Sequence, residues 1–360
     1  MDGRPIYYLE YETGKRNTAG FKAPDDVYKI CRQAGFRKVS MPEFPKGKGR
    51  IYGRIWLLTV GIWHWLRLGK RVPKGAVVIC QHPQPGRRLT LRFVRHYRKK
   101  GIKFVALIHD LESLRGGIEG VVSENRKTNE IGDNQMLKQF DVVICHNKYM
   151  RKYLVSNGFY ESRLVDLKIF DYLSDVDRVQ PGKSQSPSIC IAGNLAKGKA
   201  DYFHKIHDGG NNQNLTVNLY GVRYEPEGEN ERLVYHGAFP PEELAAHLEG
   251  DFGLVWDGTE ASTCAGNTGE YLKYNNPHKA SMYLSAGMPV IVWNQAAIAE
   301  YVLAHGVGIA VDNLFSLDET ISRISDAEYQ RLVTNAGIVS RKLRSGYYTR
   351  AAVREAVQRC

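Results

Sequence analysis

The sequence contains no hydrophobic run long enough to cross a membrane. Its most apolar stretch, residues 55–68, is interrupted by His64 and Arg67. It therefore stays below the ~18 continuous apolar residues that a membrane-spanning helix requires. The first residues are also not followed by the apolar segment and small-residue cleavage site of a signal peptide. We therefore expect a cytoplasmic protein.

Cysteine pairs with C-x-x-C spacing are missing as well. The six cysteines lie far apart along the chain, and three of them fall in apolar, strand-like stretches. In such places cysteine behaves as a small hydrophobic residue. This distribution disfavours structural zinc motifs and thioredoxin-like redox motifs, and it indicates reduced thiols.

Acidic residues are scarce in the first half of the chain. Between Cys31 and His109 the only acidic residue is Glu43, and residues 1–180 hold 34 Lys and Arg against 18 Asp and Glu. That half has a net charge of +16, whereas the remainder has 16 basic and 20 acidic residues, which gives the chain its +12. Such a field attracts anions and anionic surfaces.

Nucleic acid is one anionic partner to consider. The basic residues between Arg87 and Lys100 are dense, but we expect them to be scattered around their helix, and no nucleic-acid recognition module is apparent. We therefore predict no nucleic-acid partner.

The composition and the order of predicted elements indicate two α/β domains. The 360 residues, 43% hydrophobic and 24% charged, exclude a disordered chain and suffice for two domains. Strand-like runs alternate with amphipathic helical stretches, as in domains built on parallel sheets. We expect an N-terminal domain at 1–172, a polar linker, a second domain at 188–345, and a C-terminal helix at 346–360 that returns to the first domain. Strands are expected at 6–11, 76–81, 103–108, 141–146, 164–169, 188–192, 215–220, 233–236, 252–256, 289–293 and 308–311. Helices are expected at 25–34, 52–68, 89–99, 148–157, 241–249, 271–285 and 296–305, with two more between 327 and 358.

Common nucleotide-binding and hydrolase motifs are absent. No G-x-G-x-x-G follows a predicted strand, and H-E-x-x-H and G-x-S-x-G do not occur, which disfavours the usual dehydrogenases, zinc proteases and esterases. Residues 193–199 match G-x-x-x-x-G-K, yet Ala200 stands where a phosphate loop needs Ser or Thr to hold magnesium. The glycine-rich turn still offers backbone N–H groups and Lys197 to a diphosphate.

A crowded polar segment precedes a predicted buried helix in the second half. Pro277 is placed for the first turn of this helix and Gly287 for its C-terminal cap. That structural role does not account for the polar residues that gather at the helix start. Lys279 in the first turn combines a full positive charge with the N–H groups of a helix N-terminus, which suits a diphosphate.

At this segment the sequence resembles bacterial GT-B glycosyltransferases. Residues 274–279 (YNNPHK), followed by 283–291 (YLSAGMPVI), resemble their nucleotide-sugar site. The nearest groups are the β-1,6-galactofuranosyltransferases of surface polysaccharides and the glucosyltransferases of serine-rich adhesin glycosylation. Further matching pieces are 17–20 (NTAG), 22–23, 81–83 (QHP), 109–112 (HDLE) and 252–258 (FGLVWDG). The resemblance covers nearly the whole chain and implies two Rossmann-like, doubly wound domains that face each other across a cleft.

The resemblance also implies where a UDP-sugar binds. It places Lys279 at the pyrophosphate, Lys197 at a basic contact to UDP where the family usually has Arg, and Tyr220 at a position that stacks on uracil or covers the ribose. Asn17 matches a loop residue that reaches the nucleotide from the first domain. The substrate-binding residues implied in this way are Asn17, Lys197, Tyr220, Tyr274, Asn276, Pro277, His278 and Lys279.

Inversion at an anomeric carbon needs positive charge for the leaving diphosphate and a base for the acceptor hydroxyl. In GT-B enzymes protein cations supply the charge, so we expect no metal and no cofactor besides the UDP-sugar donor. Asp110 is our candidate base because it follows the predicted strand 103–108 at its carboxyl end, with His109 and Glu112 as substitutes. Asp110 has an equally weighted alternative role as the N-cap of a helix that begins at Leu111.

One basic helix points to a membrane surface. Between Tyr52 and Arg71 the chain interleaves three tryptophans with cations, including Arg67 and Lys70. Packing in the first domain accounts for much of its apolar face, whereas the excess of cations and tryptophans favours peripheral contact with an anionic bilayer. Such contact suits a lipid-linked acceptor.

Taken together, the sequence predicts a metal-independent, inverting hexosyltransferase. It moves galactofuranose or glucose from a UDP-sugar to a glycan acceptor in surface polysaccharide or glycoprotein synthesis, in the cytoplasm or at the inner face of the cell membrane. The alternative is a catalytically inactive GT-B-like binding subunit of a glycosylation complex. The resemblance is also compatible with a homo-oligomer.

Overall fold

A computed structural model describes residues 3–11, 19–45, 47, 49–115, 131–176, 180–226, 228 and 230–360. The chain divides into two compact units. Of the described residues, unit 1 holds those up to Tyr11, Pro24–Leu167 and Thr349–Cys360, and unit 2 holds residues 19–23 and Lys168–Tyr348. The C-terminal residues therefore belong to the first unit.

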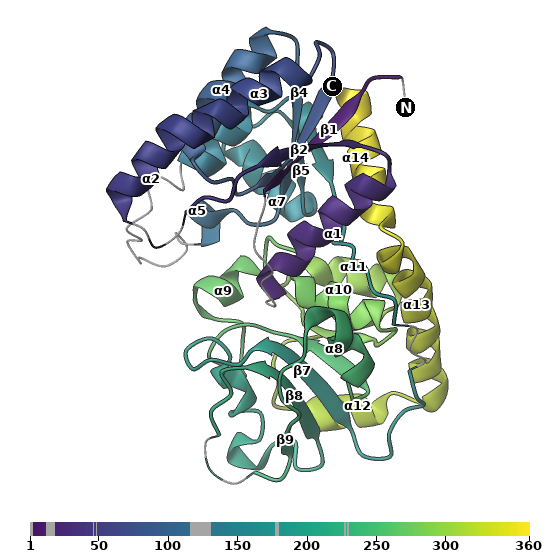
Figure 1. The fold of residues 1–360 in the computed structure, drawn as a ribbon. Coiled ribbons are helices and arrows are strands. Elements are labelled where there is room, and N and C mark those ends of the chain that lie inside the picture. The colour runs from purple at the N-terminus through teal and green to yellow at the C-terminus, as the bar shows by residue number, and fades with distance from the viewer. Residues whose placement is uncertain are drawn as a thin grey trace. The chain divides into compact units, whose positions relative to one another are not determined.

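Unit 1 is built on a parallel sheet of six strands in the order β2-β1-β3-β4-β5-β6 (Figure 1). The central strands are buried, and residues 104–108 of β4 have no exposed surface. Because helices cover both faces of such a sheet, its strands are continuous apolar runs rather than alternating ones. The strands are β1 Ile6–Tyr11, β2 Arg37–Met41, β3 Val77–His82, β4 Lys103–Ile108, β5 Val142–Cys145 and β6 Leu164–Asp166.

The strand β2 was not expected from the sequence. It pairs with β1 in register from Arg37 opposite Tyr7 to Met41 opposite Tyr11. Arg37 and Lys38 are exposed, while Val39 and Met41 are buried. As an edge strand that begins with two cations, it lacks the apolar run by which buried strands are recognised.

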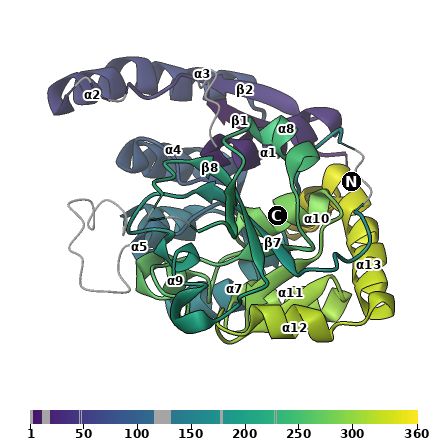
Figure 2. The same ribbon diagram turned by 90° about the horizontal axis from the view of Figure 1, so that it is seen from below.

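The helices of unit 1 mostly follow the predicted ranges. α2, η1 and α3 continue one another as a single rod (Figure 2). α7 begins after Asn147, whose side-chain oxygen accepts from the N–H groups of Tyr149 at 2.9 Å and Met150 at 3.1 Å, as an N-cap residue does. The helical elements are α1 Ala19–Gln33, whose first residues belong to unit 2, α2 Arg50–Trp56, the π-helix η1 Leu57–Gly61, α3 Ile62–Arg71, α4 Arg87–Lys99, α5 Glu112–Arg115, η2 Ile131–Met136, η3 Leu137–Gln139, α7 Lys148–Ser156, η4 Glu161–Arg163 and α14 Tyr347–Arg359.

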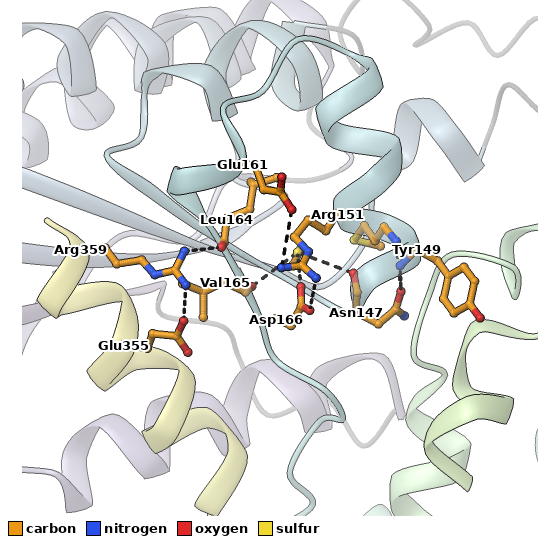
Figure 3. Close-up of polar contacts among 11 residues, drawn as sticks. Asn147, Tyr149, Arg151, Glu161, Leu164, Val165, Asp166, Glu355 and Arg359 are labelled. Carbon is orange, nitrogen blue, oxygen red and sulfur yellow. Dashed lines mark hydrogen bonds and ion pairs between the residues drawn. The ribbon is translucent and has the colours of Figure 1, made fainter. Parts of the chain in front are cut away.

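The C-terminal helix α14 is attached to unit 1 by hydrogen bonds to the edge strand β6 and to the segment before β1, and by buried side chains. Arg359 donates to the carbonyl of Leu164 in β6 at 2.8 Å (Figure 3), and Arg4 donates to the carbonyl of Val357 at 2.6 Å. Val353 and Val357 are buried. α14 therefore completes the unit in which the chain began.

Unit 2 has a second parallel sheet of six strands, in the order β12-β11-β10-β7-β8-β9. Relative to its first strand, this is the doubly wound dinucleotide-fold order 3-2-1-4-5-6. The strands are β7 Ser188–Asn194, β8 Thr216–Val222, β9 Leu233–Tyr235, β10 Phe252–Val255, β11 Val290–Trp293 and β12 Gly308–Val311. The helical elements are η5 Asp201–Phe203, η6 Asp208–Gly210, α8 Pro241–His247, α9 Gly266–Tyr271, α10 His278–Ser285, α11 Ala297–His305, α12 Leu317–Arg323 and α13 Asp326–Arg344.

The polar segment expected to be a linker is packed on unit 2 instead. Gln180 donates to the carbonyl of Gly250 at 2.8 Å, Lys183 donates to that of Ile324 at 2.5 Å, and the N–H of Ser184 donates to Asp251 at 2.8 Å. Unit 2 therefore begins at Lys168 rather than at 188. Polar composition failed as a linker signal because the polar groups of this segment are hydrogen-bonded to residues of unit 2.

One predicted helix is divided. Residues 271–285 were expected to form one helix, but α9 ends at Tyr271 and α10 begins at His278. Pro277 lacks a backbone N–H and disfavours helical geometry at the residue before it. The helix start that the sequence predicted at Pro277 is confirmed, since α10 begins directly after this residue.

Candidate functional site

The strand order of unit 2 identifies the place where a ligand is expected. The chain leaves β7 toward β8 and β9, then returns to β10 on the other side of β7. In doubly wound sheets, ligands bind outside the carboxyl ends of the two strands at this switch point. Here these ends are Asn194 of β7 and Val255 of β10.

Lys279 places its ammonium group at this switch point. Its Nζ lies 2.9 Å from Oδ1 of Asp257 and 3.2 Å from the carbonyl oxygen of Trp256, both of which follow β10. Gly193, near the end of β7, lies on the other side: a Cβ there would lie 3.4 Å from Cε of Lys279, and its φ of +137° also favours glycine. The site is thus built from two strand ends and the first turn of α10.

Asp257 controls the charge of this lysine. Burial by itself would lower the pKa of Lys279, but the carboxylate of Asp257, together with Tyr202 and Cys264, more than offsets burial and raises that pKa above its ordinary value. The side chains of Lys279 and Asp257 are 22% and 19% exposed, so the cation keeps limited access to solvent. Asp257 was not predicted as a site residue. Its position directly after a buried strand, within the matching piece 252–258, was the signal that could have identified it.

Tyr202 adds a buried hydroxyl to the same cluster. Its side chain is fully buried, and its hydroxyl has no hydrogen-bond partner among the described residues. Burial raises the pKa of Tyr202, and the charges of Lys279 and Asp257 act on it in opposite directions. The phenol is therefore a neutral, polar neighbour of the ion pair.

The residues just before Lys279 are turned toward their own unit. Asn276 is buried and donates from Nδ2 to the carbonyl of Lys168 at 3.0 Å. Pro277 is buried at the N-cap position of α10. Tyr274 is half-buried in the link between α9 and α10, and its N–H donates to the carbonyl of Tyr271 at 3.0 Å. Of these residues, Asn276 visibly anchors the segment.

His278 packs against aromatic side chains. Its ring lies 5.1 Å from that of Tyr172 and 6.0 Å from that of Phe170. Burial lowers the pKa of His278 to about 4, and the charge of Lys22 lowers it further, while a backbone contact at Asp171 opposes both. The imidazole is therefore neutral at pH 7, and it adds no positive charge beside Lys279.

Lys197 lies on the turn after β7, where its side chain is exposed. In this turn the N–H of Gly198 donates to Asp201 at 2.7 Å, so a carboxylate of the chain takes one of the groups that would cradle a phosphate. The only helix that follows directly is the three-residue η5. The glycine-rich turn therefore lacks the helix N-terminus that was expected to support it, and Lys197 is its exposed cation.

The role assigned to Tyr220 does not fit its environment. The side chain is completely buried, its ring stacks on His236 at 4.6 Å with an angle of 5° between the planes, and its hydroxyl accepts from the N–H of Glu249 at 3.0 Å. The ring has no face open to uracil or ribose. His236, which is only half-buried, covers it.

The three candidates for the base follow β4 in unit 1, at its carboxyl end. Nε2 of His109 is hydrogen-bonded to the side-chain oxygen of Gln81, and Glu112 forms an ion pair with Arg87. Asp110 is 36% exposed and lies 3.4 Å from Arg115. The side chain of Glu112 is 37% exposed, so the two carboxylates are equally accessible to solvent, and Asp110 is the one that lies directly after β4, ahead of α5.

The N-cap role considered for Asp110 is taken by other residues. α5 begins at Glu112, and the carbonyl of Leu111 accepts the helical hydrogen bond from Arg115 at 2.9 Å. The N–H of Ser113 donates to the carboxylate of Asp133 at 2.6 Å. Leu111 therefore holds the N-cap position, and Asp133 supplies the capping carboxylate.

Asp133 also forms a buried pair with His82 that sequence reasoning missed. Nε2 of His82 lies 2.7 Å from Oδ1 of Asp133, and the two side chains are 1% and 2% exposed. Burial alone would raise the pKa of Asp133, but its hydrogen bonds to His82 and Ser113 hold that pKa below its ordinary value. The pair joins the end of β3 to the start of α5. It was not detectable in the sequence because its members are 51 residues apart.

Asn17, the last of the implied contacts, lies outside the described residues. Within the described ranges, no three His, Cys, Asp or Glu side chains are grouped as metal ligands. In the same ranges, no helix is both long and apolar enough to cross a membrane.

Comparisons with known proteins cover both units. The model described as "Glucosyltransferase 3-like, N-terminal domain" matches residues 7–169, and "Glucosyltransferase 3-like, C-terminal domain" matches residues 189–356. The β-1,6-galactofuranosyltransferase WbbI of Escherichia coli (strain K12) is 32% identical over 360 residues, which cover 98% of each chain. Glucosyltransferase 3 of Streptococcus gordonii is 27% identical over 93% of each chain.

Solved structures agree on the fold. Sucrose-phosphate synthase from Thermosynechococcus elongatus matches with a TM-score of 0.59 and 12% identity over 99% of this chain and 97% of its own. The lipopolysaccharide outer core galactosyltransferase WaaB, in its apo form, matches with a TM-score of 0.59 and 10% identity over 98% of this chain and 99% of its own. The two Rossmann-like units and these neighbours confirm the predicted GT-B fold.

Proposed function

The chain belongs to the glucosyltransferase 3-like family and is a glycosyltransferase, and from that premise we propose that it transfers a hexose from a UDP-sugar to a glycan acceptor. The hexose is galactofuranose or glucose, the sugars in the names of the two full-length relatives. The acceptor belongs to a surface polysaccharide or a glycoprotein. A lipid-linked form of that acceptor is part of the proposal.

The position of Lys279 is the observation that carries this proposal. A nucleotide-sugar leaves as a diphosphate, and positive charge placed where negative charge develops lowers the barrier to departure. Lys279 holds such a charge at the switch point of unit 2, in the first turn of α10. The free N–H groups and dipole of a helix N-terminus favour an anion at the same place.

The remaining chemistry requires no metal in this proposal. Lys279 and the start of α10 stabilise the leaving group, with Lys197 as a second cation. Asp110 takes the proton of the acceptor hydroxyl, which then attacks the anomeric carbon from the face opposite the diphosphate. A single displacement of this kind inverts the configuration at that carbon. The exposure of Asp110 and its place at the carboxyl end of β4 support this role.

The experiment measures UDP release from a panel of UDP-sugars, including UDP-galactofuranose and UDP-glucose, with and without EDTA. We expect release from one of these two donors in preference to the others, undiminished by EDTA. Release that stops with EDTA and returns with a divalent cation would contradict the metal-free mechanism. Release from neither sugar, with strong release from another, would contradict the donor assignment.

Two variants distinguish an enzyme from a binding subunit. Asp110→Asn should abolish UDP release while UDP still binds, because only the base is lost. Glu161→Gln removes another exposed carboxylate of unit 1, 71% exposed, and should leave release unchanged. Equal activity of Asp110→Asn and the wild type would exclude Asp110 as the base.

A further inference from the structure

The rod formed by α2, η1 and α3 is attached to unit 1 along one side. The ring of Trp65 stacks on that of Phe93 in α4 at 5.5 Å, and the hydroxyl of Tyr97 donates to the carbonyl of Trp65 at 2.8 Å. Gly69 permits this approach, since a Cβ there would lie 2.4 Å from the Tyr97 ring. Leu68 is fully buried on the same side. The rod is therefore an ordered part of the unit.

Its opposite side exposes large apolar side chains. Of the seventeen large hydrophobic side chains that are exposed in the described part of the chain, seven lie on these 22 residues. We call them the apolar stripe. Exposed apolar residues that occur singly need no explanation, whereas a contiguous group marks an interaction site. The stripe consists of Ile51 (75% exposed), Tyr52, Ile55 (58%), Leu58 (67%), Val60, Trp63 (54%) and Leu66 (52%).

The π-helical turn η1 keeps the stripe on one side. Leu58 and Trp63 are five residues apart, and in a regular α-helix this spacing would rotate Trp63 by about 140° from Leu58. A π-turn closes its hydrogen bonds over five residues, and η1 spans Leu57–Gly61. Trp63 and Leu66 therefore continue the line begun by Ile51 and Ile55, along the straight rod seen in Figure 2.

Basic side chains flank the stripe. Arg54, Arg67, Lys70 and Arg71 of the rod are exposed, and the sequence has no Asp or Glu between Phe44 and His109. The guanidinium group of Arg67 lies 5.2 Å from the centre of the Trp63 ring. Within residues 50–71 the stripe is therefore accompanied by cations and by no acidic residue.

The neighbouring helix α4 adds a row of cations. Its exposed residues Arg88, Arg92, Arg95 and Lys99 follow one another at spacings of four, three and four, which places them on one face of the helix. The other arginines of α4 lie off this row, so the basic residues of the helix as a whole are scattered around it, as the sequence predicted. Arg87 and Arg98, which broke the pattern, pair with Glu112 and Asp141.

We propose that the apolar stripe lies in the headgroup region of an anionic lipid bilayer, with the rod parallel to the membrane. An amphipathic helix with aromatic and aliphatic residues on one face and cations beside them binds such an interface. A second copy of the chain fits this face less well, because two identical faces would bring together rows of like charge. The cations of α4 add attraction to the same anionic surface.

The test uses the full chain and two kinds of vesicle. We expect it to float with vesicles of phosphatidylcholine and phosphatidylglycerol but not with pure phosphatidylcholine. Trp63 provides the most direct probe, since Trp65, Trp256 and Trp293 are buried and Trp56 is half-buried. Its emission should shift to the blue on binding and be quenched by brominated acyl chains. Trp63→Phe should keep binding and lose most of this signal.

Two variants test the contributions of the apolar stripe and of the flanking cations to membrane binding separately. Ile55→Ser/Leu58→Ser/Leu66→Ser should abolish flotation. Arg67→Gln/Lys70→Gln/Arg71→Gln should weaken binding roughly 100-fold, from about 1 kcal/mol per cation at an anionic surface. The matched controls are Leu303→Ser/Ile338→Ser and Arg323→Gln/Arg331→Gln, at exposed positions of unit 2, and both should bind as the wild type does.

Three results would overturn the proposal. One is a wild-type chain that does not bind anionic vesicles. Another is stripe and cation variants that bind as well as the wild type. The third is light scattering that shows a wild-type oligomer which the stripe variant converts to a monomer, without any vesicle binding, because the stripe would then be an interface between copies.

Discussion

Lys279 and Asp257 form an ion pair that couples the stability of unit 2 to the charge of the candidate site. In Lys279→Ala the partly buried carboxylate of Asp257 loses its cation, so we expect the free energy of unfolding to fall by about 1–3 kcal/mol. We also expect turnover to fall by about 100- to 1000-fold, the loss typical when one stabilising group is removed from a charged transition state. Urea unfolding and UDP release measure the two effects.

The double variant Lys279→Ala/Asp257→Asn separates these two effects. It removes both charges, so stability should return toward that of the wild type while turnover stays low. Recovery of turnover together with stability would show that Lys279 acts only as the partner of Asp257. The exposed ion pair of Arg323 and Glu319 is the matched control, and its removal should change neither quantity.

At the scale of elements, the approach of α3 to α4 depends on Gly69. A Cβ at this position would lie 2.4 Å from the Tyr97 ring, and that ring is held by its hydrogen bond to Trp65. We expect Gly69→Ala to lower the free energy of unfolding by about 1–3 kcal/mol, as overpacking does. Thermal unfolding followed by circular dichroism measures the change.

Gly337 in α13 is the control for helical glycine. Apart from its own helix backbone, no atom of the described residues lies within 4 Å of a Cβ placed there, so Gly337→Ala should stabilise the chain by about 0.5–1 kcal/mol through helix propensity alone. If both variants stabilise equally, then Tyr97 moves aside without cost. The contact between α3 and α4 would then not hold the rod in place.

For the whole molecule, each unit contains a buried histidine that resists protonation. Burial lowers the pKa of His146 in unit 1 and of His278 in unit 2 to about 4. The unfolded chain takes up these protons as the pH falls through about 6.5. The folded chain takes them up only near 4. The free energy of unfolding should therefore fall with pH across this window, by at most about 3 kcal/mol for each histidine.

This dependence is measured as the urea concentration at the unfolding midpoint, from about pH 7.5 down to about pH 4.5, which covers the fall through the unfolded pKa toward the folded one. His146→Gln and His278→Gln should each flatten the slope, whatever their effect at neutral pH. His96→Gln changes an exposed histidine on α4 and should retain the wild-type slope. An unchanged slope in both buried variants would show that other groups cause the loss of stability in acid.

The sequence predicted most elements because their signals are local. β1, β4 and β12 have the predicted bounds, and α10 begins directly after Pro277. Apolar runs and prolines act within a few residues, so a single chain displays them. β2 was missed because its first two residues are exposed cations at a sheet edge.

The candidate site was only partly predictable. Lys279 was named from its place in a helix start and from the family resemblance, whereas Asp257, Tyr202 and the pair of His82 and Asp133 were not. Tyr220 was assigned to the ligand although β8 buries it completely. A strand position predicts that a residue is near the end of a sheet, but burial is set by the elements that pack over it.

The sequence by itself determined the α/β class, the two-domain order, the position of the key helix start and the excess of positive charge in the first half. These properties follow from composition and from patterns within a few residues. The tertiary structure alone decided that Asp257 faces Lys279, that Asn276 anchors to Lys168 across 108 residues, and that the π-turn aligns the apolar stripe. Such contacts join residues far apart in the chain, and they exist only once the order of the strands and the packing of the helices are set.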